Sequence, residues 1–224
     1  MPVYASVVID VDSTLCGVEG IDFLAARRGP EVTARIVALT DQAMKGEIAL
    51  ESIYGHRLTT IRPTRADIAA LATEYERTLA PGAADAIAAM RAERVRIALV
   101  SGGIREAIAP VARTLGFDSA DLHAVSLRFD DAGNYLDFDQ SSPLTTQPGK
   151  PMLVGALIEE GRLPRRVLAV GDGATDAKLV GVVNTFVAYT GFARRANVVA
   201  VADLEVASFA QLAQLVTGAQ YTPG

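Results

Sequence analysis

A short apolar strand that ends in two acids constrains this chain more than any other feature. Val7-Val8-Ile9 is a β-branched run, and Asp10-Val11-Asp12 follows it directly. Such a run is typical of a buried strand. Carboxylates at i and i+2 just beyond its end can share one small site, where burial and mutual repulsion favour a hard cation such as Mg²⁺. A metal-bound Asp can also act as a nucleophile. The alternative interpretation makes Asp10 a loop residue and Thr14 a helix cap.

Length and composition limit the classes to which this chain can belong. Its 224 residues, 50% of them hydrophobic, suffice for one domain or for a domain with an insertion. No apolar run approaches the roughly 20 residues of a membrane span, and the N-terminus lacks the pattern of a secretory signal. The net charge of −5 disfavours nucleic-acid binding. The lone Cys16 fits a reducing cytoplasm. We therefore expect a cytoplasmic monomer or homodimer without nucleic-acid or membrane partners.

Strands and helices alternate along most of the chain, which predicts an α/β fold with a Rossmann-like, mainly parallel sheet. The expected strands are 5–11, 96–101, 166–171 and 184–189. The expected core helices are 81–93, 104–115, 150–160 and 208–216.

Two segments break this alternation. The first holds four successive helical patterns with no convincing strand between them, at 21–28, 32–45, 50–60 and 64–78. We therefore predict a helical cap, residues 17–78, inserted after the first strand of a core made of 1–16 and 79–224. In the second, apolar runs at 124–129 and 135–138 flank an Asp/Gly/Asn turn, which predicts a small β-hairpin.

Four segments fall where a doubly wound sheet binds its ligand, at the carboxyl ends of strands. The first is Asp10-Val11-Asp12. In the second, Ser101-Gly102-Gly103, the hydroxyl and N–H groups can hold a phosphate oxygen, although a plain tight turn is the simpler interpretation. The third is Lys150, which is either a surface residue or a group that neutralises a carboxylate and a phosphoryl oxygen. The fourth is Gly171-Asp172-Gly173-Ala174-Thr175-Asp176, whose acids are either helix N-terminal charges or metal ligands. Together they predict a site for a cation and an oxyanion.

In order and spacing, these segments resemble the four motifs of the haloacid dehalogenase-like phosphatases, over nearly the whole chain. Within that superfamily the chain looks most like the phosphoserine phosphatase group. The resemblance extends into the predicted cap. Glu19 stands where that group holds the substrate ammonium, Met44-Lys45-Gly46 matches a Met-x-Gly segment, and Arg57 stands where an Arg holds the substrate carboxylate. Without the resemblance, Glu19 and Arg57 would be interpreted as ordinary surface charges.

The resemblance also implies a mechanism. Asp10 would attack phosphorus and form an aspartyl-phosphate, while Asp12 would serve first as acid and then as base. Mg²⁺ would be held by the Asp10 carboxylate, the Asp12 backbone carbonyl and Asp172, with Asp176 supporting it directly or through water.

The same resemblance assigns the phosphoryl oxygens. Lys150, Ser101 and the Gly102 N–H would stabilise them during transfer. Substrate binding would thus rest on Ser101 and Gly102 together with Glu19 and Arg57.

Three departures from the group leave the exact substrate open. Leu50 replaces an aromatic Phe, Thr175 replaces the commoner Asn, and Thr190-Gly191-Phe192-Ala193 replaces a Lys-Pro-like stretch. Our first prediction is a Mg²⁺-dependent phosphatase that converts L-phosphoserine to L-serine, a step of serine biosynthesis. The alternatives are a phosphatase or phosphotransferase for another small phosphomonoester, and a non-catalytic module that binds a phosphorylated metabolite.

Overall fold

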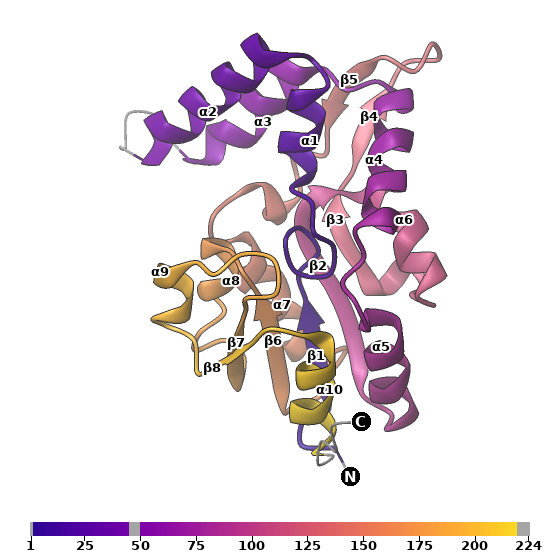
Figure 1. Ribbon diagram of the computed structural model, residues 1–224, viewed down its shortest axis with the longest axis vertical. Coiled ribbons are helices and arrows are strands. Elements are labelled where there is room, and N and C mark those ends of the chain that lie inside the picture. The colour runs from indigo at the N-terminus through magenta and orange to yellow at the C-terminus, as the bar shows by residue number, and fades with distance from the viewer. Residues whose placement is uncertain (1, 45–49, 219–224) are drawn as a thin grey trace.

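Six parallel strands form the central sheet of this computed structural model, which describes residues 2–44 and 50–218, without the side chains of 40–44 and 50–52 (Figure 1). The strands are β1 (Ser6–Ile9), β2 (Arg96–Ile104), β3 (Leu122–Val125), β6 (Val167–Gly171), β7 (Thr185–Tyr189) and β8 (Leu204–Val206). Their order is β3-β2-β1-β6-β7-β8. The chain therefore builds the sheet outward from β1 in both directions, and the strand order reverses beside β1. Doubly wound sheets bind ligands at such a reversal, outside the carboxyl ends of the strands.

Both faces of the sheet are buried, which explains why its strands are continuous apolar runs. Alternate side chains of β1 enter different clusters, because Val7 and Ile9 pack on one face and Val8 packs on the other. The first face is covered by α5 (Ala83–Ala92), α6 (Arg105–Thr114) and α10 (Phe209–Thr217). The second is covered by α7 (Gly149–Glu159) with the short α8 (Ala174–Ala177) and α9 (Ala196–Val199). The molecule is thus a three-layer α/β structure, as predicted.

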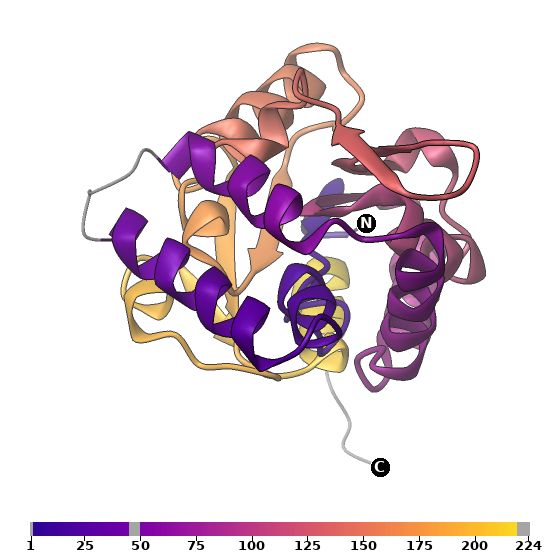
Figure 2. The ribbon, with the colours of Figure 1, turned by 90° about the horizontal axis from the view of Figure 1, so that it is seen from above.

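Four helices follow β1 before the sheet resumes: α1 (Gly20–Ala26), α2 (Pro30–Met44), α3 (Leu50–Ile61) and α4 (Arg65–Arg77). Figures 1 and 2 show α1 to α3 gathered beyond the carboxyl ends of the strands, with α2 and α3 side by side. α4 runs back beside α6. A hairpin of β4 (Leu127–Phe129) and β5 (Tyr135–Phe138) lies near the start of α4, where the Arg65 N–H donates to the Gly133 carbonyl over 2.9 Å. No helix among the described ranges is long and apolar enough to cross a membrane.

The structure differs from the sequence prediction in two strands. β2 continues through Ser101-Gly102-Gly103 to Ile104 instead of ending in a tight turn, and its pairing with β3 shifts register between Val100 and Ile104. The apolar run 124–129 is not one arm of the hairpin, because Leu122–Val125 is the edge strand β3 and only Leu127–Phe129 pairs with β5. The short elements β8 and α9 were not predicted, and the helix expected after Gly171-Asp172-Gly173 is only the short α8. They span three or four residues, too few to show a period.

Candidate active site

Lys150 is buried between two carboxylates, one directly after β1 and the other in α8. Its Nζ lies 2.8 Å from Asp10 Oδ1 and 2.6 Å from Asp176 Oδ1. Lys150 belongs to the first turn of α7, Asp10 follows β1 and Asp176 lies in α8. Burial and the nearby Asp176 raise the pKa of Asp10 to about 7, although Lys150 opposes this shift. The ammonium group thus partly offsets the repulsion between the two acids.

Asp12 lies two residues beyond Asp10, in a tight loop that follows β1. Ser13 adopts a φ of 52°, a left-handed conformation that is uncommon for a residue with a side chain. The Leu15 N–H donates back to the Asp10 carbonyl over 3.2 Å, which closes the loop. The Asp12 carboxylate accepts a 2.5 Å hydrogen bond from the Tyr75 hydroxyl of α4. Burial and the charge of Glu19 raise the pKa of Asp12 to about 7, so this group can exchange a proton near neutral pH.

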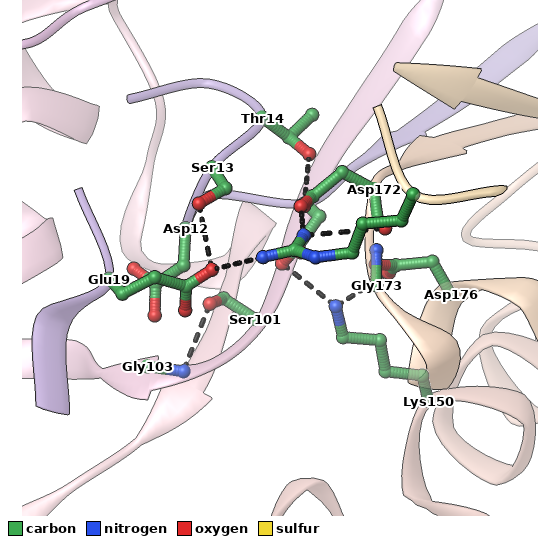
Figure 3. A network of polar contacts seen from close by, with 12 residues as sticks. Asp12, Ser13, Thr14, Glu19, Ser101, Gly103, Lys150, Asp172, Gly173 and Asp176 are labelled. Carbon is green, nitrogen blue, oxygen red and sulfur yellow. Dashed lines mark hydrogen bonds and ion pairs between the residues drawn. The ribbon is translucent and has the colours of Figure 1, made fainter. Parts of the chain in front are cut away.

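Asp172, at the tip of β6, is held by two groups from other parts of the chain (Figure 3). The Thr14 hydroxyl donates to Asp172 Oδ1 over 3.0 Å. The Arg195 guanidinium contacts Asp172 Oδ2 through Nη1 and donates through Nη2 to Glu19 Oε1 over 3.0 Å. Glu19 also accepts a 2.7 Å hydrogen bond from the Ser13 hydroxyl. Arg195 therefore connects Glu19, which precedes α1, to Asp172, which follows β6.

Ser101 lies in β2, beside β1, with its hydroxyl oxygen already occupied as an acceptor. The Gly103 N–H donates to Ser101 Oγ over 2.9 Å. The hydroxyl hydrogen remains available, so Ser101 can donate to an anion in the site. Gly103 has little room for a side chain, since a Cβ there would lie 3.1 Å from Ser101 Oγ and 3.2 Å from Asp12 Oδ2. β2 thus approaches the Asp12 carboxylate closely.

Three buried carboxylates provide donors for a cation. Oxygens of Asp10, Asp172 and Asp176 lie within 4.8 Å of one another, and such a donor set suits a hard divalent cation. Asp172 Oδ1 accepts from the Thr14 hydroxyl, and Asp172 Oδ2 is in contact with the Arg195 guanidinium. Both Asp176 oxygens are engaged, by Lys150 over 2.6 Å and by the Gly173 N–H over 3.0 Å. Each of the three carboxylates therefore already has partners in the site, and a bound cation would share their oxygens with Lys150, Thr14 and Arg195. Asp12 has its carboxylate outside this group, which leaves its backbone carbonyl as the predicted ligand.

One pocket of about 440 Å³ brings these groups together with charged residues from the helices above the sheet. Glu19 and Arg57 both line it, along with Asp10, Asp12, Ser101, Gly102, Lys150, Asp172 and Arg195. Arg57 donates through Nη2 to Asp22 over 2.5 Å. Its buried Nε has no hydrogen-bond partner in the described part of the chain. Arg57 therefore keeps a donor for a further anionic group.

Comparisons with known proteins agree with this geometry. The family model of the haloacid dehalogenase-like hydrolases matches residues 7–180. The chain belongs to the haloacid dehalogenase-like hydrolase family.

Within this family, the chain resembles phosphoserine phosphatases along its length. It is 34% identical over 209 residues to the chloroplastic phosphoserine phosphatase of Arabidopsis thaliana, which covers 92% of this chain and 70% of that one. It is 31% identical over 207 residues to the phosphoserine phosphatase of Bos taurus, with 92% and 91% covered. The crystal structure of a phosphoserine phosphohydrolase-like protein from Francisella tularensis gives a TM-score of 0.80 at 25% identity and covers 95% and 99% of the two chains. The predicted membership of the phosphoserine phosphatase-like group is thereby confirmed.

Sequence reasoning missed two residues of this hydrolase's site. Arg195 follows the Thr190-Gly191-Phe192-Ala193 stretch, which departs from the group's pattern, and no motif marks it. Tyr75 belongs to α4, and the spacing of apolar residues in this helix predicts an ordinary core side chain at that position. Of the residues that bear on substrate choice, Lys45 and Gly46 lie outside the described residues, as do the side chains of Met44 and Leu50.

Proposed function

We propose that this hydrolase transfers the phosphoryl group of L-phosphoserine to water and releases L-serine. The observation that carries the proposal is the single pocket that joins Asp10, Asp12 and Lys150 to Glu19 and Arg57. The first three residues supply chemistry for any phosphomonoester. The last two offer opposite charges for the ammonium and carboxylate groups of an amino acid. The printed names of the curated relatives support the same substrate.

The first half-reaction uses both carboxylates. An Asp10 oxygen forms a bond to phosphorus as the bond from phosphorus to the serine oxygen breaks. The leaving oxygen takes the proton of Asp12. Because the pKa of Asp12 is raised to about 7 by burial and by Glu19, a substantial fraction of Asp12 holds that proton at neutral pH.

The second half-reaction reverses the role of Asp12. A water oxygen forms a bond to phosphorus, its proton goes to the Asp12 carboxylate, and the bond from phosphorus to Asp10 breaks. Both residues thereby return to their starting states, with Asp12 again holding the proton that the next leaving group takes. One residue can therefore serve in both steps without an additional base.

Three groups surround the place where phosphorus must lie to reach Asp10. Lys150 Nζ is already 2.8 Å from Asp10 Oδ1, so a phosphoryl oxygen beside that carboxylate meets a positive charge. The hydroxyl of Ser101 and the N–H of Gly102 are the proposed donors from β2. Donors fixed in advance stabilise the charge that spreads over the phosphoryl oxygens in a loose transition state.

The donor set also supports a divalent cation, which we propose to be Mg²⁺ held by Asp10, Asp172 and the Asp12 carbonyl. When bound, the cation shields the negative charges of nucleophile and phosphate from each other. Asp176 is proposed to support the cation directly or through water, and it also holds Lys150, whose Nζ lies 2.6 Å from its Oδ1.

The remaining proposals concern the molecule and its setting. Residues 17–78 form the cap, and the core consists of 1–16 and 79–224. The cap supplies Glu19 and Arg57, and it excludes water when substrate is bound. The protein acts in the cytoplasm, in serine biosynthesis, as a monomer or homodimer.

The test is phosphate release from L-phosphoserine with Mg²⁺, beside O-phosphoethanolamine, phospholactate and an EDTA control. We expect metal-dependent turnover with kcat/KM highest for L-phosphoserine. O-phosphoethanolamine lacks the carboxylate and phospholactate lacks the ammonium group. If both are hydrolysed as well as L-phosphoserine, the proposed substrate is wrong although the proposed chemistry stands. If no phosphomonoester is hydrolysed, the proposal of an enzyme is wrong.

A further inference from the structure

Two donors from the helices above the sheet hold the carboxylate of Asp12. The Tyr75 hydroxyl, from α4, donates to Asp12 Oδ1 over 2.5 Å across 63 positions of sequence. A backbone N–H at Gly20, where α1 begins, also hydrogen-bonds this carboxylate. Asp12 is thus held by groups that lie outside the sheet and its motifs.

The contact between Tyr75 and Asp12 depends on close packing. The Tyr75 side chain is 0% exposed and belongs to the main hydrophobic cluster. A Cβ at position 20 would lie 2.4 Å from the Tyr75 hydroxyl, so the glycine there makes room for it. A buried phenol with a fixed ring has little freedom to turn away from its acceptor. The hydrogen bond therefore restricts the Asp12 carboxylate to one orientation.

That orientation distinguishes the two oxygens of Asp12. Oδ1 accepts from Tyr75. Oδ2 lies on the side of β2, since a Cβ at Gly103 would be 3.2 Å from it and 3.1 Å from Ser101 Oγ. The Ser101 hydroxyl is one of the proposed donors to the phosphoryl group. Oδ2 therefore lies on the side of the site where Ser101 is proposed to hold the phosphoryl group.

We propose that Tyr75 is a positioning residue that holds Asp12 so that Oδ2 delivers and collects the proton during phosphoryl transfer. The inference rests on the proposed function, because it assigns the geometry of the same two proton transfers. In the first, the proton leaves Asp12 Oδ2 for the serine oxygen as its bond to phosphorus breaks. In the second, a proton of the attacking water passes to Oδ2 as the bond between phosphorus and Asp10 breaks.

The experiment compares Tyr75→Phe with Tyr4→Phe. Each variant removes the hydroxyl of a buried tyrosine and with it one hydrogen bond. The bond of Tyr4 joins its hydroxyl to Thr185 Oγ1 over 2.8 Å, and neither residue lines the pocket. We expect Tyr75→Phe to lower kcat for L-phosphoserine by about 10- to 100-fold, since misplacing a catalytic group by about 1 Å can cost on the order of 10²-fold. KM should change less than about twofold. Tyr4→Phe should keep the wild-type kcat while losing a similar amount of thermal stability.

A second substrate separates the two proton transfers. The leaving group of p-nitrophenyl phosphate departs without a proton, so only its second half-reaction needs Asp12. In rapid mixing, Tyr75→Phe should release p-nitrophenolate in a burst at the wild-type rate, followed by slow steady turnover. A burst that slows as much as the turnover would show that Tyr75 acts on the whole site rather than on proton transfer, and would overturn the inference.

A double-mutant cycle tests whether Tyr75 acts through Asp12. In an Asp12→Asn background, Tyr75→Phe should lower the residual kcat less than about twofold. An undiminished effect there, or a wild-type kcat for Tyr75→Phe alone, would contradict the inference. If Tyr75→Phe fails to fold, Gly20→Ala moves the hydroxyl sterically and should give the same kcat loss. If the wild-type protein hydrolyses no phosphomonoester, the proposed function itself is wrong.

Discussion

Asp10 must be ionised to attack phosphorus, yet its surroundings favour the neutral form. Burial and Asp176 raise the pKa of Asp10 to about 7, while Lys150 opposes the shift. The nucleophile therefore depends on positive charge brought to it by α7 and, in the proposed function, by a cation. Lys150, whose Nζ lies 2.8 Å from Asp10 Oδ1, is the group of this chain that supplies that charge.

Asp10→Asn should abolish turnover and leave the fold intact. The amide keeps the shape of the side chain and removes a buried negative charge, but it cannot form the phosphoryl intermediate. Phosphate release should fall by at least about 10⁴-fold, a loss on the scale expected for a removed nucleophile, while circular dichroism and the melting curve stay close to wild type. Asp85→Asn, at an exposed position of α5 outside the pocket, is the matched control and should retain most of the turnover. Near-wild-type activity of Asp10→Asn would refute the nucleophile assignment.

Arg57→Gln should lower kcat/KM for L-phosphoserine by about 10- to 100-fold, because a charged hydrogen bond contributes about 1.5–3 kcal/mol. O-phosphoethanolamine has no carboxylate, so its kcat/KM should change less than about threefold. The opposite pattern is expected for Glu19→Gln, which should lower kcat/KM for O-phosphoethanolamine more than for phospholactate. Equal losses on all three esters would assign these two residues to the general structure of the pocket instead of to the two ends of the substrate.

Three of the candidate residues could be recognised in the sequence because of their place in the backbone. Asp10, Ser101 and Asp172 each follow an apolar run of a parallel sheet, whose strand ends must meet at one edge. Tyr75 and Arg195 reach the same place from a helix and a loop that carry no such signal. Their positions depend on how distant elements pack, which a local pattern does not contain.

At the scale of elements, Asp67 connects the start of α4 to the end of α1. Its carboxylate accepts from the Thr64 N–H over 2.9 Å, and the Thr64 hydroxyl accepts from the Asp67 N–H over 3.2 Å, which makes a capping box. Arg27 donates to the same carboxylate over 3.2 Å, and Arg28 also contacts it. Arg28 further donates to the Ile61 carbonyl over 2.9 Å. One buried acid therefore fixes three helices relative to one another.

Asp67→Asn should reduce the free energy of unfolding at pH 7 by about 1–3 kcal/mol, the usual cost of a lost cap and a charged hydrogen-bond acceptor. The pKa of Asp67 lies well below its usual range because hydrogen bonds from Arg28, Thr64 and Arg27 outweigh burial, the largest single contribution. The folded state thus binds this proton less readily than the unfolded state. The stabilisation is fully present above about pH 4, the ordinary pKa of an Asp, and declines as pH falls below it.

Urea unfolding of wild type and Asp67→Asn between pH 7 and pH 3 measures this difference. The two free energies should converge as the pH falls. Glu76→Gln, on an exposed position of the same helix, is the control and should follow the wild type within about 0.5 kcal/mol at every pH. A constant gap between wild type and Asp67→Asn down to pH 3 would show that the carboxylate charge does not contribute.

Elements were predictable to the extent that they are long. The helices of the predicted cap and the central strands carry enough apolar residues to reveal a period, and they were placed to within a few residues. β3 was merged with β4 because only Ser126 separates the two strands. β3 pairs with β2, whereas β4 pairs with β5. An apolar run does not indicate the strand with which it will pair.

At the scale of the whole molecule, the strand order brings the charges together. β1 lies between β2 and β6, so three neighbouring strands deliver Asp10, Ser101 and Asp172 to one edge. The cost of this arrangement is repulsion, because Asp10, Asp172 and Asp176 have carboxylate oxygens within 4.8 Å of one another. The folded chain presents this cluster and the unfolded chain does not. A ligand of the cluster must therefore shift the folding equilibrium of the entire molecule.

A divalent cation should raise the melting temperature, and the rise should depend on Asp172. At about 100 times its dissociation constant, a cation that binds only the folded state adds about 2.7 kcal/mol. For a chain of this length that corresponds to about 5–10 °C, at about 2–4 °C per kcal/mol. Asp172→Asn removes one proposed ligand and should lose most of the rise with MgCl₂, whereas Asp130→Asn, in the turn between β4 and β5, should keep it. EDTA should return the wild type to its metal-free melting temperature. An equal rise in both variants would mean that the ions act on general surface charge, and Asp172 would then have no part in holding the cation.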